Sequence, residues 1–448
     1  SGKMHKFLEA RGHLRNFRKE DFEGPLREND MKLLFSRYWG FPVHTLYLTM
    51  GNILGFANVS KKFLKKYGVF QKWVSAILYM LSFLNYPFDV GEILVLLAEK
   101  NPSGFLRLWR KKFEMKIRSL GKICYGLLKA RVFKLKSPLA VSWALTYRCD
   151  EQCLYCRLNH EVLEELSTRE ALEILEQLHR ARVWGVVFTG GEPLLREDIG
   201  LILDRAAALG LRVVLNTNGK RVPDAISKIK KIFLLKISLD GPEEIHDSIR
   251  GKGNFQKVVT AIKTARQAGI AVELNTVISS LNAAFIPEVI RIAKGYRIQV
   301  SFQPASLLLL GGKGPNPIAT PDKAYQKAID YLIAHKREGG EVIATSLATL
   351  EHLKLWPQKN RINCFAGSLS CRIEPDGLLL ACGWTPILIL KRSDGIDLRK
   401  HSFEKALQML RQPSCDGCWS SACVDFNLLG SWNFRSAYEL FKKWKRLL

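Results

Sequence analysis

The sequence predicts an α/β fold, in which a parallel sheet curls into a partial (β/α)6 TIM-like barrel between a basic helical N-terminal region and a small cysteine-rich C-terminal domain. Between about residues 139 and 305, six short apolar segments alternate with helical segments, a pattern typical of a parallel sheet with crossover helices. The glycine-rich and polar stretches of this region fall where the predicted strands end. Because functional residues of such barrels gather at the carboxyl ends of the strands, this edge is the expected site.

The elements of the barrel follow from local patterns in chain order. Strands are predicted at 139–147, 183–193, 211–219, 232–241, 270–278 and 298–305. Helices are predicted at 167–181, 198–210, 254–269 and 283–296. The first of these helices begins with Ser167 and Glu170 in the spacing of a capping box, and the second ends at Gly210.

The charge of the chain is concentrated in residues 1–137, the predicted N-terminal domain. The 448-residue chain has a formal net charge of +26, and this region holds 26 basic and 10 acidic residues. Such a balance favours an acidic partner, such as nucleic acid, an anionic membrane surface or a phosphorylated substrate. The apolar segment 41–60 is interrupted by Pro42 and polar residues, and 73–88 is shorter than the ~20 residues of a membrane span. The region is therefore expected either to cap the main domain or to lie on a membrane surface.

Three further segments follow the predicted barrel, which spans 138–305. Residues 306–360 are expected to form a Gly/Pro-rich loop, which is either a lid or a linker, followed by a helix, and residues 361–430 to form the cysteine-rich domain. Residues 431–448 predict a basic amphipathic helix that docks either on the protein itself or on a membrane. The N-terminus is charged throughout and lacks the apolar core of a signal peptide, so we expect a cytoplasmic protein, with peripheral association at the inner membrane face as an option.

Nine of the ten cysteines fall into two groups with metal-ligand spacing. The first group, Cys149, Cys153 and Cys156, forms a C-x3-C-x2-C array directly after the first strand. Three thiolates can hold three irons of a [4Fe–4S] cluster and leave the fourth iron open to a non-protein ligand. A zinc site completed by His160 is the alternative for the array alone. Cys124 stands apart and is expected to be a core thiol.

Several motifs beyond the array resemble the radical S-adenosylmethionine (radical SAM) superfamily. Tyr155 precedes the last cysteine of the array, as an aromatic residue does in that family, and "TGGEP" after the second strand resembles its Gly-Gly-Glu motif. "SLDG" (238–241) and "DSIRG" (247–251) resemble the segments that contact the ribose and carboxylate of SAM. The resemblance covers about 139–305. It implies a group of SAM-binding residues: Tyr155, Gly190, Gly191, Glu192, Asn216, Ser238, Asp240, Arg250 and Asn275.

The resemblance also implies the chemistry. A one-electron reductant, such as a flavodoxin- or ferredoxin-like protein, would reduce the cluster, which would cleave SAM to a 5′-deoxyadenosyl radical. That radical would abstract a hydrogen atom from an unactivated carbon of the substrate. Cys149, Cys153 and Cys156 would hold the cluster that cleaves SAM, and the protein would orient the reactants and exclude side reactions.

The second cysteine group resembles the auxiliary iron–sulfur extensions called SPASM and twitch domains. Its metal-ligand candidates are Cys364, Cys371, Cys382, Cys415, Cys418 and Cys423. The pattern C-x12-G-x4-C followed by C-x2-C carries the resemblance, and Asn427 stands where the full pattern has another cysteine. We expect at least one auxiliary [4Fe–4S] cluster, held by Cys364, Cys371, Cys382 and one later cysteine. A second cluster with Asp425 as a ligand and a zinc ribbon are the alternatives.

Four functions compete on these observations. A radical SAM enzyme acting on a membrane lipid or lipid-linked substrate is the main prediction, because apolar and basic segments combine in the N-terminal region. A maturase of ribosomally made peptides and an RNA-modifying radical SAM enzyme are the alternatives. A non-catalytic iron–sulfur carrier is disfavoured, because a carrier has no need for SAM-binding motifs.

Overall fold

The computed structural model of the protein describes residues 126–127, 130–132, 134–160, 163–311, 314–319, 322–358, 362–383, 392–413, 415 and 417–447. The chain divides into two units, and all of these residues belong to the second, Glu114–Leu448. The predictions for the apolar segments 41–60 and 73–88 and for Cys124 lie outside the described residues.

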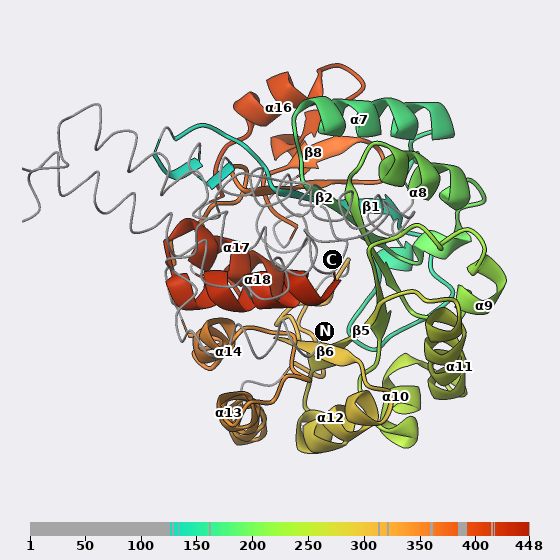
Figure 1. The fold of residues 1–448 in the computed structure, drawn as a ribbon, viewed down its shortest axis with the longest axis vertical. Helices are drawn as coiled ribbons and strands as arrows, with labels where there is room; N and C mark the ends of the chain where they lie inside the picture. The colour runs from blue at the N-terminus through green and yellow to red at the C-terminus, as the bar shows by residue number, and fades with distance from the viewer. Residues whose placement is uncertain are drawn as a thin grey trace, which may run out of the picture. The chain divides into compact units, whose positions relative to one another are not determined.

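One nine-stranded sheet organises the described part of the chain (Figure 1). Its strand order is β6-β5-β4-β3-β2-β1-β7-β8-β9, and the pairs from β1 to β6 are all parallel. The sheet is open rather than closed, because β1 pairs with β7 and not with β6. The prediction of a partial barrel is therefore confirmed. The six barrel strands are β1 (Ala140–Thr146), β2 (Gly185–Gly190), β3 (Arg212–Thr217), β4 (Leu234–Ser238), β5 (Val272–Ile278) and β6 (Gln299–Pro304).

The crossover helices pack on one face of these strands and form the main core with them. Alternate strand residues such as Val141, Phe188 and Leu215 are fully buried in this core. The capping box predicted at Ser167 and Glu170 is present at the start of α7. The helices of the barrel are α7 (Thr168–Arg180), α8 (Ile199–Ala208), α9 (Val222–Ala225), α10 (Glu243–Arg250), α11 (Asn254–Gln267) and α12 (Ile286–Gly295).

The cysteine-rich segment extends the same sheet. Strand β7 (Ser370–Ile373) lies parallel to β1, and β8 (Leu378–Leu380) and β9 (Ile396–Asp397) continue antiparallel. Gly377, in the turn between β7 and β8, has a φ of 86°, which an L-residue with a side chain rarely adopts. Five helices complete the described C-terminal part: α13 (Lys323–Arg337), α14 (Leu347–Leu353), α16 (Phe403–Met409), α17 (Ser421–Gly430) and α18 (Phe434–Leu447).

Helix α18, the predicted basic amphipathic helix, docks on the protein itself. Ala437 and Leu440 pack into a second apolar cluster that contains Leu139, Phe365 and Leu429. Its polar side also makes contacts, since Lys442 pairs with Glu341 at 2.8 Å. Of the two predicted docking modes, the intramolecular one is confirmed for these side chains. In the described part of the chain, no helix combines the length and apolarity that a bilayer crossing requires.

Candidate active site

The C-x3-C-x2-C array lies on the loop that follows β1, at the carboxyl edge of the sheet. Cys153 is buried, and Cys149 and Cys156 are partly buried. The loop is held by backbone bonds, because Leu154 N donates to Ile249 O at 3.0 Å and Leu310 N donates to Tyr155 O at 3.2 Å. Leu310 belongs to the Gly/Pro-rich loop after β6, so that loop packs directly on the cysteine array. Burial raises the pKa of all three thiols, that of Cys149 to about 11, so metal binding must displace their protons.

Gly190 and Gly191 bring the turn after β2 against the cysteine loop. A Cβ at Gly190 would lie 2.1 Å from the backbone oxygen of Thr146, and one at Gly191 would lie 2.2 Å from that of Arg148. Gly190 also has a φ of 127°. The amide of Gly191 donates to Thr146 O at 2.7 Å, and that of Glu192 donates to Arg148 O at 2.8 Å. No larger residue would permit this approach, which explains the glycine pair.

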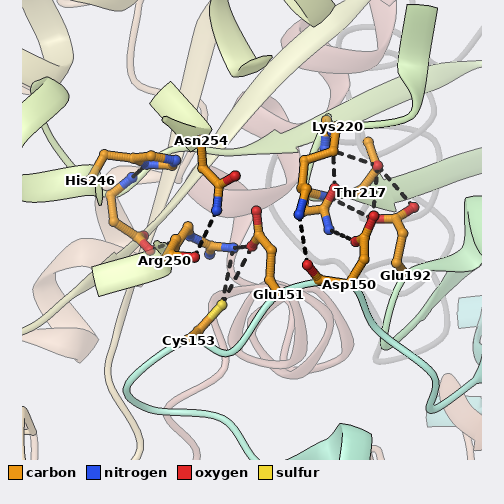
Figure 2. A network of polar contacts seen from close by, with 12 residues as sticks. Asp150, Glu151, Cys153, Glu192, Thr217, Lys220, His246, Arg250 and Asn254 are labelled. Atoms are coloured by element: carbon orange, nitrogen blue, oxygen red, sulfur yellow. Dashed lines mark hydrogen bonds and ion pairs between the residues drawn. The ribbon is translucent and has the colours of Figure 1, made fainter. Parts of the chain in front are cut away.

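Glu192 is fully buried and ties this turn to the end of β3 (Figure 2). Its carboxylate accepts hydrogen bonds from Thr217 Oγ1 at 3.0 Å, from the Asn218 amide at 2.8 Å and from the Leu194 amide at 3.0 Å. Burial raises the pKa of Glu192 to about 7 despite these donors. Both carboxylate oxygens are thus used within the protein, and a role of Glu192 toward SAM stays a prediction.

Arg250, at the end of α10, joins the segment after β4 to the cysteine loop. Its Nε donates to Asp240 Oδ2 at 2.6 Å, and its Nη1 donates to Glu151 Oε2 at 3.2 Å and to Cys153 Sγ at 3.8 Å. Its Nη2 donates to the hydroxyl of Tyr155, which donates to Asp240 Oδ2 at 2.9 Å. Figure 2 shows the guanidinium of Arg250 beside both Glu151 and Cys153. The structure thus brings together Tyr155, Asp240, Arg250 and one array cysteine, and their roles toward SAM stay predictions.

Ser238 is the last residue of β4 and Asn216 is the next to last of β3, whereas Asn275 lies in the middle of β5. Ser238 and Asn275 are register partners on neighbouring strands, and Ser301 Oγ donates to Asn275 Oδ1 at 3.1 Å. Asn216 pairs in register with Lys236. All three side chains alternate with residues of the helix-facing core, so they face the inner side of the sheet.

The residues present fit a [4Fe–4S] cluster and SAM. Across the described residues, no three His, Cys, Asp or Glu side chains converge on one ion position. In a four-iron cluster each thiolate binds a different iron, so the sulfurs surround a cage rather than one point. Two buried acceptor atoms, Asn216 Oδ1 and Glu151 Oε1, have no hydrogen-bond partner within the described structure. They would accept from the ammonium or hydroxyl groups of SAM. The side chain of His160, the zinc alternative, is not among those described.

The second cysteine group separates into five neighbouring thiols and one core thiol. Cys364 interacts with Cys382 and Cys415, and Cys423 is in hydrogen-bond contact with Cys382 and Cys418. Cys371 instead pairs with Val141 in the sheet register and is 2% exposed within the main core. The expected ligand set of Cys364, Cys371 and Cys382 is therefore not the set that the fold brings together, because strand alternation turns Cys371 inward beside Ile373.

Two polar residues of this segment have structural partners. Asn427, at the position where the SPASM pattern has a cysteine, accepts a hydrogen bond from the Phe365 amide at 2.8 Å and so fixes the chain beside Cys364. Asp425 Oδ1 accepts from Ser346 Oγ at 2.8 Å and from Thr349 Oγ1. These contacts bind Asp425 to α14 and favour a structural role over cluster ligation.

Comparison with known proteins identifies the family. Residues 143–287 match the model of the radical SAM superfamily. The mycofactocin maturases MftC of Mycobacterium tuberculosis (strain CDC 1551 / Oshkosh) and Mycobacterium ulcerans (strain Agy99) are 32% and 30% identical over 263 residues. These matches cover 55% of this chain, and 65% and 69% of the respective relatives. The chain belongs to the radical SAM superfamily. That superfamily uses a [4Fe–4S] cluster and SAM, which confirms both cofactor predictions.

Other radical SAM proteins are similar over comparable or shorter lengths. A pre-heme d1 synthase of Dinoroseobacter shibae is 30% identical over 45% of this chain and 52% of its own length. The crystal structure of Streptococcus suis SuiB bound to precursor peptide SuiA has a TM-score of 0.51 and 18% identity, and it covers 63% of this chain and 67% of SuiB. This likeness confirms the fold. The chain spans 65% of the length of the first curated relatives that it matches.

Sequence reasoning missed one residue of the site, Glu151, and one buried residue outside it, Arg196. Glu151 lies inside the array, so its position was a usable signal, but its pairing with Arg250 is 99 residues distant in sequence. Arg196 donates to the backbone oxygens of Leu145 and Leu166 and pairs with Asp198 at 2.7 Å, behind the cysteine loop. No motif marks Arg196, because apart from the nearby Asp198 its partners are groups that only the fold brings near.

Proposed function

We propose that this chain is a radical SAM maturase that modifies a peptide substrate. The observation that carries the proposal is the 30–32% identity to the mycofactocin maturases MftC. The fold shared with SuiB, whose solved complex contains the precursor peptide SuiA, supports it. These relatives favour a peptide substrate over the predicted lipid substrate. The lipid prediction rests on the composition of residues 1–137. None of the relatives reported above is an RNA-modifying enzyme.

The five-thiol group supports an auxiliary cluster in this maturase. Cys364, Cys382, Cys415, Cys418 and Cys423 exceed the four thiolates of one [4Fe–4S] cluster by one. We assign them one auxiliary cluster, with Cys371 excluded. Cys364 and Cys382 flank the β7–β8 hairpin, which extends the sheet from β1, so one sheet would carry both cluster segments.

The residues of the site have distinct tasks in the proposed reaction. When bound, the cluster of the array supplies the electron that cleaves SAM. Glu192 and the two glycines hold the turn after β2 against the cysteine loop. Asn216 and Ser238 on the inner side of the sheet offer polar groups to the nucleoside. A low-potential flavodoxin- or ferredoxin-like protein would deliver the electron.

A tetrapyrrole substrate is the second candidate, because the pre-heme d1 synthase of D. shibae is also 30% identical. Anaerobically reconstituted full-length protein, SAM and dithionite would be incubated with a low-molecular-weight cell extract, and 5′-deoxyadenosine would be quantified. We expect the extract to raise the yield, and protease pretreatment of the extract to abolish that rise. A rise that survives protease and follows an added porphyrin, a lipid fraction or an RNA fraction would overturn the peptide proposal.

A further inference from the structure

All three nitrogens of the Arg250 guanidinium donate to protein groups, which conflicts with the role that its motif implies. The resemblance assigns Arg250 to the carboxylate of SAM, a group that needs a free fork of N–H donors. In the structure, Arg250 is 7% exposed, and its donors reach Asp240, Glu151, Cys153 and Tyr155. The ring of Tyr155 also lies 5.5 Å from the guanidinium carbon. A carboxylate of SAM would have to displace a buried partner.

One of these contacts falls on a sulfur of the SAM-binding array. Arg250 Nη1 lies 3.8 Å from Cys153 Sγ, and the carboxylate Oε2 of Glu151 lies 3.5 Å from the same sulfur. Cys153, Glu151 and Arg250 are all buried, so water screens neither the carboxylate charge of Glu151 nor the guanidinium charge of Arg250. Arg250 and Glu151 themselves form an ion pair of 3.2 Å. One buried cation and one buried anion therefore border a single ligand sulfur.

We propose that Arg250 and Glu151 are positioning residues that set the reduction potential of the SAM-binding cluster through Cys153. An N–H donor and a positive charge beside a ligand sulfur stabilise the more negative, reduced cluster and raise its potential. A carboxylate beside the same sulfur has the opposite effect. The effects of Arg250 and Glu151 on the reduction potential thus offset each other, while Asp240 and Tyr155 hold the guanidinium in place.

The inference rests on the cluster but not on the identity of the substrate, so it is tested without substrate. The potential of the cluster whose electron paramagnetic resonance signal responds to SAM would be measured by redox titration in reconstituted full-length protein. Glu151→Gln is expected to shift this potential to a more positive value, and Arg250→Gln to a more negative one. The double variant is expected to return close to the wild-type value, and Arg250→Lys to lie between wild type and Arg250→Gln. A glutamine side chain has nearly the same shape as a glutamate side chain, so Glu151→Gln should fold. The proposal can therefore be refuted with this variant even if Arg250→Gln fails to fold.

Arg196→Gln is the matched control. Arg196 is also buried and ion-paired, but its described contacts are to Asp198, Glu165 and backbone oxygens. We expect it to lower stability without moving the potential. The affinity of Arg250→Gln for SAM should change by less than about tenfold, the equivalent of one ordinary hydrogen bond. A loss of SAM binding beyond that at unchanged potential, or equal potential shifts in Arg196→Gln and Arg250→Gln, would overturn the proposal.

Discussion

Replacement of Cys371 and of Cys364 by alanine should have opposite consequences for iron binding and for the apoprotein. Cys371, on β7, is 2% exposed in the main core, and Cys364 lies near enough to Cys382 and Cys415 for their charges to act on it. Cys371→Ala removes one buried sulfur atom, which is comparable in size to a methylene group. The loss of burial and the small cavity should cost about 1 kcal/mol of unfolding free energy. Iron content should stay at the wild-type value.

Cys364→Ala should instead leave the stability of the apoprotein nearly unchanged and remove the auxiliary cluster, about four irons per chain. Iron would be determined colorimetrically after anaerobic reconstitution, together with the visible absorbance of the clusters. The stability of the metal-free protein would be measured by urea denaturation, since bound clusters violate two-state behaviour. If Cys371→Ala lost as much iron as Cys364→Ala, the assignment of Cys371 to the core would be wrong.

Three further predictions concern the cysteine loop and its supports. Gly191→Ala would place a Cβ 2.2 Å from a backbone oxygen of the loop, so we expect it to lose the SAM-binding cluster, about four irons per chain in an iron assay. Tyr147→Phe removes a donor to the fully buried Glu374 and should cost about 1–3 kcal/mol in urea denaturation of the apoprotein; an unchanged midpoint would contradict that hydrogen bond. Because burial raises the pKa of Glu192 to about 7, the folded state binds an extra proton between the ordinary carboxyl pKa and about pH 7, and stability should fall as pH rises through this window. Glu192→Gln should remove that part of the pH dependence, as seen in the difference between the two stability curves of the apoprotein.

Much of the fold could be predicted because its signals are local. The six barrel strands and the capping box of α7 depend on apolar period and on residues three positions apart. The pairing of β7 with β1 joins segments about 230 residues apart, and no local pattern encodes it. That pairing nevertheless places Cys371 in the main core and not among the other cysteines. The sequence shows that Cys371 and Ile373 lie on one face of the strand and Arg372 on the other. Which of the two faces is buried depends on the partner strand.

The sequence allowed us to predict which residues belong to the candidate site, but not which of their atoms contact one another. Residues at strand ends converge in any parallel barrel, so Tyr155, Asp240 and Arg250 were expected near the cysteines. Which atoms pair depends on side chains that compete for the same donors. Arg250 is buried among two carboxylates, a hydroxyl and a thiol, and a motif names none of these partners.

The sheet itself connects the two cysteine groups through a buried polar contact. Tyr147, two residues before Cys149, donates its hydroxyl to Glu374, and Arg372, next to Cys371 on β7, donates to the same carboxylate at 2.6 Å. The side chain of Arg372 reaches the chain beside Cys382, since a Cβ at Gly383 would lie 3.1 Å from its Cδ. Removing one partner of a buried ion pair leaves an uncompensated charge, at a cost of about 3–5 kcal/mol. The Tyr147–Glu374 hydrogen bond therefore supports the pairing of β1 with β7 alongside the backbone bonds, and it links the segments that carry the two cysteine groups.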